Sequence, residues 1–186
     1  MNRFRLLGTL FATAALGACS DIPYPKTLGA HADLINTSGY KIGDADFAEG
    51  ENQPGVVLRL HIWDLPPGLH GMHIHDQGRC DTPDFDLAGG HFNPFGKKHG
   101  LKNPEGPHAG DLPNLNIPSS GWVDITVGIP SVTLRDGRNS LLQPHGTSIV
   151  IHAHADDDMS DPAGNSGARI ACGVIRSLTP PELETQ

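Results

Sequence analysis

The stretch VVLRLHIW, residues 56–63, decides the fold class, because it is short, apolar and β-branched and alternates in part with polar side chains. A period of two is typical of a β-strand with one buried face. Similar short stretches recur: AHADLIN (30–36), GWVDITVG (121–128), TSIVIHAH (147–154) and ARIACGVI (168–175). The chain contains 23 glycines and 16 prolines, which punctuate nearly every gap between these stretches. Short strands joined by turns predict an all-β sandwich or barrel.

The beginning of the chain predicts export. Arg3 and Arg5 precede an almost unbroken run of apolar or small residues over 6–16. Such a pattern is typical of a secretory signal peptide, which we place at residues 1–18. The run is too short to cross a bilayer as a mature helix, and no later stretch approaches about 18 consecutive apolar residues. The 186 residues therefore leave room for one ordinary domain after the signal.

The segment LGACS, residues 16–20, resembles the bacterial lipobox, in which the cysteine is lipidated and becomes the mature N-terminus. Cys19 is thus the predicted lipidation site, and residues 19–29 form a short tether. Ser20 in the following position resembles sorting to the outer membrane. The predicted location is the periplasm or cell envelope, anchored through Cys19. The alternative is ordinary cleavage nearby, with Cys19 discarded or incidental.

The charge balance argues against a nucleic-acid partner. The formal net charge of −8 becomes −10 when residues 1–18 are removed, because that segment carries two arginines and no acids. Binding to nucleic-acid phosphates needs clustered lysines and arginines, which an acidic chain does not supply.

Cysteine usage predicts one disulfide. The chain has three cysteines, and the lipobox accounts for Cys19. Cys80 and Cys172 remain as an even pair in an exported chain, which favours an intramolecular disulfide. The alternative is a pair of free buried thiols.

Histidines gather in HGMHIHDQGRC, residues 70–80. Residues two apart in a strand face the same side, so His73 and His75 present two imidazoles together. This is an arrangement typical of metal ligands, although such pairs also occur by chance on solvated sheet faces.

A long segment after this strand, from residue 77 to about 116, has little periodic apolar pattern. A loop of this length in a compact domain is usually functional or disordered. It carries His91, His99, His108 and Asp111. Three imidazoles and a carboxylate make the closed tetrahedral set that structural zinc accepts. We therefore expect zinc to replace the missing apolar core as the element that folds the loop.

A second apolar strand, in TSIVIHAHADDD (147–158), adds His152, with Asp156 four residues later. His152 with His73, His75 and one loop histidine would make four imidazoles, a set that suits copper. The pattern as a whole predicts two metals. His154 is either a further ligand or a residue at the rim of the site.

Five segments together resemble the copper/zinc superoxide dismutase family, and they occur in the order found there. They are GLHGMHIHDQG (68–78), GGHFNPFGKKHG (89–100), GPHAGDLPN (106–114), IVIHAHADD (149–157) and GNSGARIACGVI (164–175). The resemblance covers residues 30–176 and leaves residues 177–186 as a C-terminal tail. It implies a flattened eight-stranded Greek-key β-barrel with long metal-binding and electrostatic loops.

The resemblance also implies ligand roles, with one copper and one zinc per subunit. The implied copper ligands are His73, His75, His91 and His152, and the implied zinc ligands are His91, His99, His108 and Asp111. His91 would bridge the two metals. Asp156 resembles the outer carboxylate that links His73 to His99 and fixes their rings.

The activity implied is dismutation of superoxide to dioxygen and hydrogen peroxide, which would protect the cell envelope. Arg169 resembles the arginine that receives the anion beside copper, and His91 resembles the histidine that carries a proton during the cycle. Cys80 and Cys172 resemble the disulfide that ties the long loop to the last strand. The resemblance allows a homodimer.

Other classes of function remain as alternatives. A catalytically weak or inactive copper-binding or copper-buffering envelope lipoprotein would keep the ligands and could lose Arg169 or the zinc loop. A structural lipoprotein would not need six ordered histidines. A zinc hydrolase would need an open zinc position with a general base nearby, which a closed set does not offer.

The loop expected to steer the anion is acidic. Residues 155–169 carry four aspartates and no lysine. Superoxide dismutase is itself a standard example of electrostatic steering, so rapid capture does not follow automatically for this chain. Lys97, Lys98 and Lys102 either compensate from the other loop or form a solvated face.

Overall fold

The computed structural model describes residues 28–50 and 54–178. The predicted signal peptide, Cys19, most of the tether and most of the C-terminal tail lie outside these residues. Nine strands occur in the order β1 (Leu28–Asn36), β2 (Lys41–Glu49), β3 (Val56–Ile62), β4 (Gly68–His70), β5 (Met72–His75), β6 (Leu115–Ile117), β7 (Val123–Ile129), β8 (Thr147–His152) and β9 (Arg169–Ser177). The helical structure of the described residues is limited to one 3-10 turn, Asp86–Ala88, and none of it is long and apolar enough to cross a membrane.

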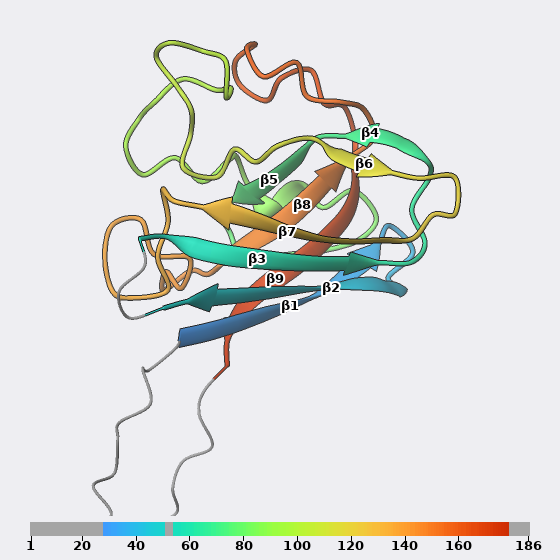
Figure 1. Cartoon of the computed structure of the whole chain (residues 1–186), viewed down its shortest axis with the longest axis horizontal. Helices are drawn as coiled ribbons and strands as arrows, with labels where there is room; N and C mark the ends of the chain where they lie inside the picture. The colour runs from blue at the N-terminus through green and yellow to red at the C-terminus, as the bar shows by residue number, and fades with distance from the viewer. Residues whose placement is uncertain (1–27, 51–53, 179–186) are drawn as a thin grey trace, which may run out of the picture.

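Seven strands form one curled antiparallel sheet in the order β5-β8-β9-β1-β2-β3-β7 (Figure 1). The short strands β4 and β6 form a separate pair. Neighbours such as β3 and β7 are distant in sequence, so long connections cross between strands as in Greek-key folds. The all-β prediction is confirmed. The described strands number nine rather than eight: seven form the curled sheet, and the three-residue strands β4 and β6 form the separate pair.

Alternation along β3 explains its place in the sheet. Leu58, Leu60 and Ile62 are fully buried, whereas Val57 and Arg59 at alternate positions face solvent. Strands β5 and β8 differ, because every residue in both is buried. These two paired strands therefore lie inside the molecule with both faces covered, and they carry three of the predicted ligands.

The Cys80–Cys172 disulfide is present and spans 92 residues of sequence, which confirms the predicted pairing. It joins the segment after β5 to β9. Around it lies a small apolar cluster in which Phe85, Ala88 and Val150 are fully buried. The disulfide and this cluster hold residues 80–88 against the sheet beside the histidines.

Glu49 at the end of β2 holds the connection between β7 and β8 in place. Its buried carboxylate accepts hydrogen bonds from the Leu134 backbone N–H at 2.5 Å, the Thr133 hydroxyl at 2.7 Å and Arg135 Nε at 3.2 Å. Burial alone would raise the pKa of Glu49, but these three donors outweigh burial and lower it below its usual value of 4.5.

Replacing Glu49 with glutamine should lower the free energy of unfolding at pH 7 by about 1–3 kcal/mol. Because the pKa of Glu49 is lower in the folded state, its ionised form stabilises the fold above the unfolded pKa. That contribution disappears as pH falls through the folded pKa, so the difference between wild type and Glu49→Gln should shrink below about pH 4.5. Urea titrations from pH 7 to pH 3, with the exposed Glu105→Gln as control, measure this. A difference that is constant with pH would contradict the prediction.

Candidate metal centre

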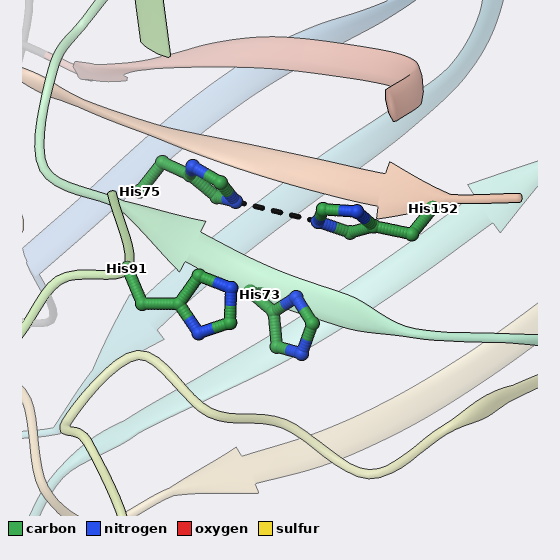
Figure 2. A group of neighbouring side chains, drawn as sticks. All are labelled: His73, His75, His91 and His152. Atoms are coloured by element: carbon green, nitrogen blue, oxygen red, sulfur yellow. Dashed lines mark hydrogen bonds between the residues drawn. The ribbon is translucent and has the colours of Figure 1, made fainter. Parts of the chain in front are cut away.

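Four buried histidines converge where β5 and β8 lie side by side. His73 and His75 come from β5, His152 ends β8, and His91 approaches from the long loop through a single bridge to His75 (Figure 2). One ring nitrogen from each can be chosen so that all four lie within 4.8 Å of one another. The period of two along β5 places its two imidazoles on one face, as predicted.

Each of these four rings has one nitrogen fixed by a protein oxygen. The partners are Asp156 Oδ2 for His73 Nε2 at 2.5 Å, the Gly89 carbonyl for His75 Nδ1 at 3.0 Å, Asp111 Oδ1 for His91 Nδ1 at 2.9 Å, and the Gly167 carbonyl for His152 Nδ1 at 3.1 Å. For His73, His75 and His152 these oxygens are the usual outer supports of metal-binding imidazoles, because they set ring orientation and tautomer, whereas Asp111 is itself a candidate ligand beside His91.

The remaining nitrogens face one another. His73 Nδ1 and His91 Nε2 are buried without a hydrogen-bond partner among the described residues. His75 Nε2 and His152 Nε2 lie 3.4 Å apart, with nitrogen facing nitrogen. Leaving buried polar atoms unsatisfied is costly, and native structures rarely tolerate it without a reason. Four convergent lone pairs fit a transition metal such as copper.

The acid–base properties of three of these rings agree with that fit. Burial holds the pKa of His75 well below its ordinary value. Burial lowers the pKa of His91 to about 4 although Asp111 opposes the shift, and burial together with the charge of His73 lowers the pKa of His152 to about 3. The three imidazoles are therefore neutral at pH 7 and keep a lone pair for a metal.

A second set surrounds the Asp111 carboxylate. Asp111 Oδ1 lies 2.9 Å from His91 Nδ1, 3.1 Å from His99 Nδ1 and 3.3 Å from His108 Nδ1. Ligands about 2.0–2.1 Å from a zinc ion at tetrahedral angles lie roughly 3.3 Å apart, so these atoms match a closed zinc site. His91 contributes one nitrogen to each set.

His108 is placed in this set by its contact with Asp111. The ligand atoms of His73, His91, His99 and Asp111 also lie within 4.8 Å of one another. However, the Nε2 of His73 is engaged by Asp156, whereas the buried His108 Nδ1 is close to Asp111 without a hydrogen bond to it. His108 Nδ1 is thus a buried nitrogen with no hydrogen-bond partner among the described residues, which leaves it available to a metal beside Asp111.

The other oxygen of Asp111 fixes the loop. Asp111 Oδ2 accepts the backbone N–H groups of Gly100 and His108, each at 2.9 Å. Burial would raise the pKa of Asp111, but the histidines and these amides lower it far below its ordinary value. The carboxylate is therefore charged at any ordinary pH, and it holds two parts of the loop beside the three imidazoles.

Asp156 connects the two sets. Its Oδ2 contacts His73 Nε2 at 2.5 Å and its Oδ1 contacts His99 Nε2 at 3.0 Å. Burial would lower the pKa of His99, but Asp111 and Asp156 raise it to about 10. Asn114, to which we gave no role from sequence, clamps the Asp156 backbone with bonds of 2.7 and 2.8 Å.

Gly164 lies against the Asp156 carboxylate, which joins His73 to His99. Gly164→Ala should disrupt these contacts. A Cβ at this position would overlap the Asp156 carboxylate and lie 2.7 Å from His99 Nε2, in a backbone with φ +60° that favours glycine. We expect a loss of about 2 kcal/mol or more in unfolding free energy and about tenfold or more in Zn²⁺ affinity. Competition with a chelator measures the Zn²⁺ affinity. Gly128→Ala, where a Cβ meets open space, is the control; equal behaviour of the two variants would refute the prediction.

Arg169 stands beside the four-histidine set. It begins β9 opposite His152. Its Nη1 donates to the Phe85 carbonyl and its Nη2 to the Gly89 carbonyl, both at 2.6 Å. The Gly89 carbonyl also holds His75 Nδ1, so one oxygen positions both the guanidinium and an imidazole. Arg169 keeps other N–H groups for an anion.

Several other charged residues and histidines lie outside the two ligand sets. Lys98 and Lys102 are exposed and pair with Asp161 and Asp158, so their charges are partly offset. His154 is exposed and belongs to neither ligand set. A third grouping of His31, Asp33 and Asp44 lies on the outer face of β1 and β2, but Lys41 Nζ already contacts both carboxylates, at 2.5 and 2.6 Å.

Comparison with known proteins gives a consistent result. A family model described as copper/zinc superoxide dismutase matches residues 41–175. The Cu-Zn superoxide dismutase 2 of Aquifex aeolicus is 50% identical over 174 residues, covering 92% of this chain and 99% of the relative. A superoxide-dismutase-like protein from Bacillus subtilis has a TM-score of 0.75 at 41% identity, with 79% of this chain and 98% of that chain covered. The Cu/Zn superoxide dismutase of Brucella abortus has a TM-score of 0.64 at 28% identity, with 80% and 99% covered.

Proposed function

This chain belongs to the copper/zinc superoxide dismutase family, and from that premise we propose how its residues share the work of the reaction. The four-histidine set of His73, His75, His91 and His152 would hold copper, and the set of His91, His99, His108 and Asp111 would hold zinc. The observation that carries the assignment is the convergence of buried, unsatisfied ring nitrogens whose opposite nitrogens are fixed by oxygens.

The protein dismutes superoxide: two superoxide ions and two protons give dioxygen and hydrogen peroxide. Copper, when bound, supplies the one-electron chemistry by alternating between its two oxidation states. The residues of the chain must then bind a small anion, hold a proton at a defined atom, and keep the ligand side chains in position throughout the reaction.

His91 is the residue we propose to carry the proton, on Nε2. This nitrogen is buried and points into the four-histidine set, while Nδ1 is fixed 2.9 Å from Asp111. The buried Nε2 has no hydrogen-bond partner among the described residues, so it is the ring atom available to hold a proton. Asp111 holds the imidazole in place during this exchange, so the ring does not need to reorient.

Arg169 is the residue we propose to receive superoxide. Its two bonds to the Phe85 and Gly89 carbonyls immobilise the guanidinium beside His75 and His152. A permanently charged, fixed fork of donors orients an anion without being reorganised when it arrives.

Turnover separates this function from that of a copper carrier. Residues 20–186, purified and loaded with copper and zinc, should dismute superoxide rapidly in a stopped-flow or pulse-radiolysis assay. Full occupancy of both metals without turnover would instead identify a copper-binding lipoprotein on the same scaffold.

We also propose that the protein is exported and anchored in the outer membrane through Cys19. The supporting features are the signal-like residues 1–18 and LGACS at 16–20. The start of β1 at Leu28 lies at the end of the molecule opposite the loops around residues 94–108 and 154–168 (Figure 1). An anchor on that side would leave the metal centre facing away from the membrane.

Expression of the full chain in a Gram-negative host tests the anchor. Wild type should partition into the membrane fraction, and Cys19→Ser should leave it, because the acyl chains have no other attachment point. Ser20→Asp should keep the lipid but shift the protein towards the inner membrane. A Cys19→Ser protein that stays with the membrane would refute lipidation at this residue.

A further inference from the structure

A cavity of about 500 Å³ opens beside Arg169. Gly167, whose carbonyl holds His152 Nδ1, lines the same cavity. The cavity is therefore lined by Arg169 and by the residue whose carbonyl supports His152.

Two carboxylates share the cavity wall with Arg169. Asp84 and Asp86 are exposed, and neither has an ion-pair partner among residues 28–50 and 54–178. Phe85 between them is fully buried, and its carbonyl accepts Arg169 Nη1. This hydrogen bond and the burial of Phe85 fix the position of Asp84 and Asp86 on either side of it.

Lys98 and Lys102 are each already paired with a carboxylate. Lys98 Nζ lies 3.0 Å from Asp161, and Lys102 Nζ lies 2.8 Å from Asp158. Asp157 accepts only neutral donors, from Met159, Ser160 and Asn165. The cavity thus contains one fixed positive charge and two negative charges, and the adjacent loop adds no net positive charge.

We propose that Asp84 and Asp86 lower the rate at which monoanions, superoxide included, are captured at Arg169. This inference rests on the proposed role of Arg169. An approaching monoanion is repelled by two carboxylates before it reaches the guanidinium, whereas a neutral molecule such as hydrogen peroxide is not. The two aspartates therefore lower the association rate without touching the reacting atoms.

The expected size of the effect follows from Coulomb's law. A unit charge roughly 8–10 Å away in a water-like medium changes the local concentration of a monoanion about twofold at low salt. Two such charges give a change of about two- to fivefold. At an ionic strength of about 1 M the screening length falls to about 3 Å, which removes the effect.

The double variant Asp84→Asn with Asp86→Asn tests the proposal on the copper- and zinc-loaded protein. Asparagine keeps the Oδ1 acceptor through which Asp84 accepts the Asp86 backbone N–H at 3.1 Å, so the local turn is preserved. Pulse radiolysis should show kcat/KM raised about two- to fivefold at 10 mM ionic strength and equal to wild type near 1 M. The control Asp64→Asn removes the same charge from an exposed residue outside the cavity lining and should change nothing.

Azide titration of the same proteins, followed by visible absorption, gives a readout independent of turnover. The Kd for this monoanion should fall by a similar factor in the double variant at low ionic strength. An unchanged kcat/KM and Kd would overturn the proposal, as would a change that persists at 1 M salt. If wild type binds both metals without turning over, the assigned function fails, and the azide result alone still decides the role of Asp84 and Asp86.

Discussion

Dismutation should fall at least about a hundredfold when His152 is replaced by alanine, while zinc stays bound. His152 Nε2 belongs to the four-histidine set and lies 3.4 Å from His75 Nε2, and His152 is not a member of the set around Asp111. Loss of an outer partner of a ligand typically costs 10- to 100-fold in metal affinity or activity. Loss of one of the four copper ligands themselves should cost more. The rate should be measured by pulse radiolysis and both metals by mass spectrometry of the dialysed protein.

His31→Ala is the matched control for that variant. His31 lies on the outer face of β1, where it contacts Asp46 at 2.7 Å, and it belongs to neither proposed metal set. Its removal should leave the rate and the copper and zinc content unchanged. A His152→Ala protein that kept most of its activity would show that the redox chemistry does not depend on this set.

Short runs rich in Leu, Ile and Val predicted β3 and β8, where these residues are buried. β2 was not predicted, because its buried positions include Gly43 and Ala45 and its outward positions carry acids. β4 and β6 were missed for another reason: three residues are too few to show any period.

The ligand histidines could be predicted because they lie in short local motifs, such as the HxH pair on β5. The contacts that hold these histidines in place could not be predicted. The Asn114 clamp on Asp156 joins residues 42 apart, and the bond from Arg169 to Phe85 joins residues 84 apart. The ion pairs of Lys98 and Lys102 likewise join two loops. Such contacts depend on how loops meet in space, which local sequence pattern does not encode.

The second large effect is expected at Asp111. Asp111→Asn should reduce Zn²⁺ affinity at least about a hundredfold and lower the unfolding free energy of the metal-loaded protein by roughly 3–5 kcal/mol. The oxygen that lies 2.9–3.3 Å from three imidazole nitrogens would lose its charge. In addition, an amide nitrogen in place of Oδ2 would face the N–H groups of Gly100 and His108, so that donor would meet donor.

Chelator competition measures the zinc affinity of Asp111→Asn, and hydrogen exchange reports whether the segment around residues 93–108 loses protection. The exposed Asp136→Asn removes one carboxylate elsewhere and should alter neither quantity. Because His91 belongs to both sets, Asp111→Asn should also free its Nδ1 and weaken, without abolishing, the hold on copper. The two variants therefore predict opposite metal losses: mainly copper for His152→Ala and mainly zinc for Asp111→Asn. Equal loss of both metals from both variants would mean that the two sets bind as one unit rather than as two sites joined by His91.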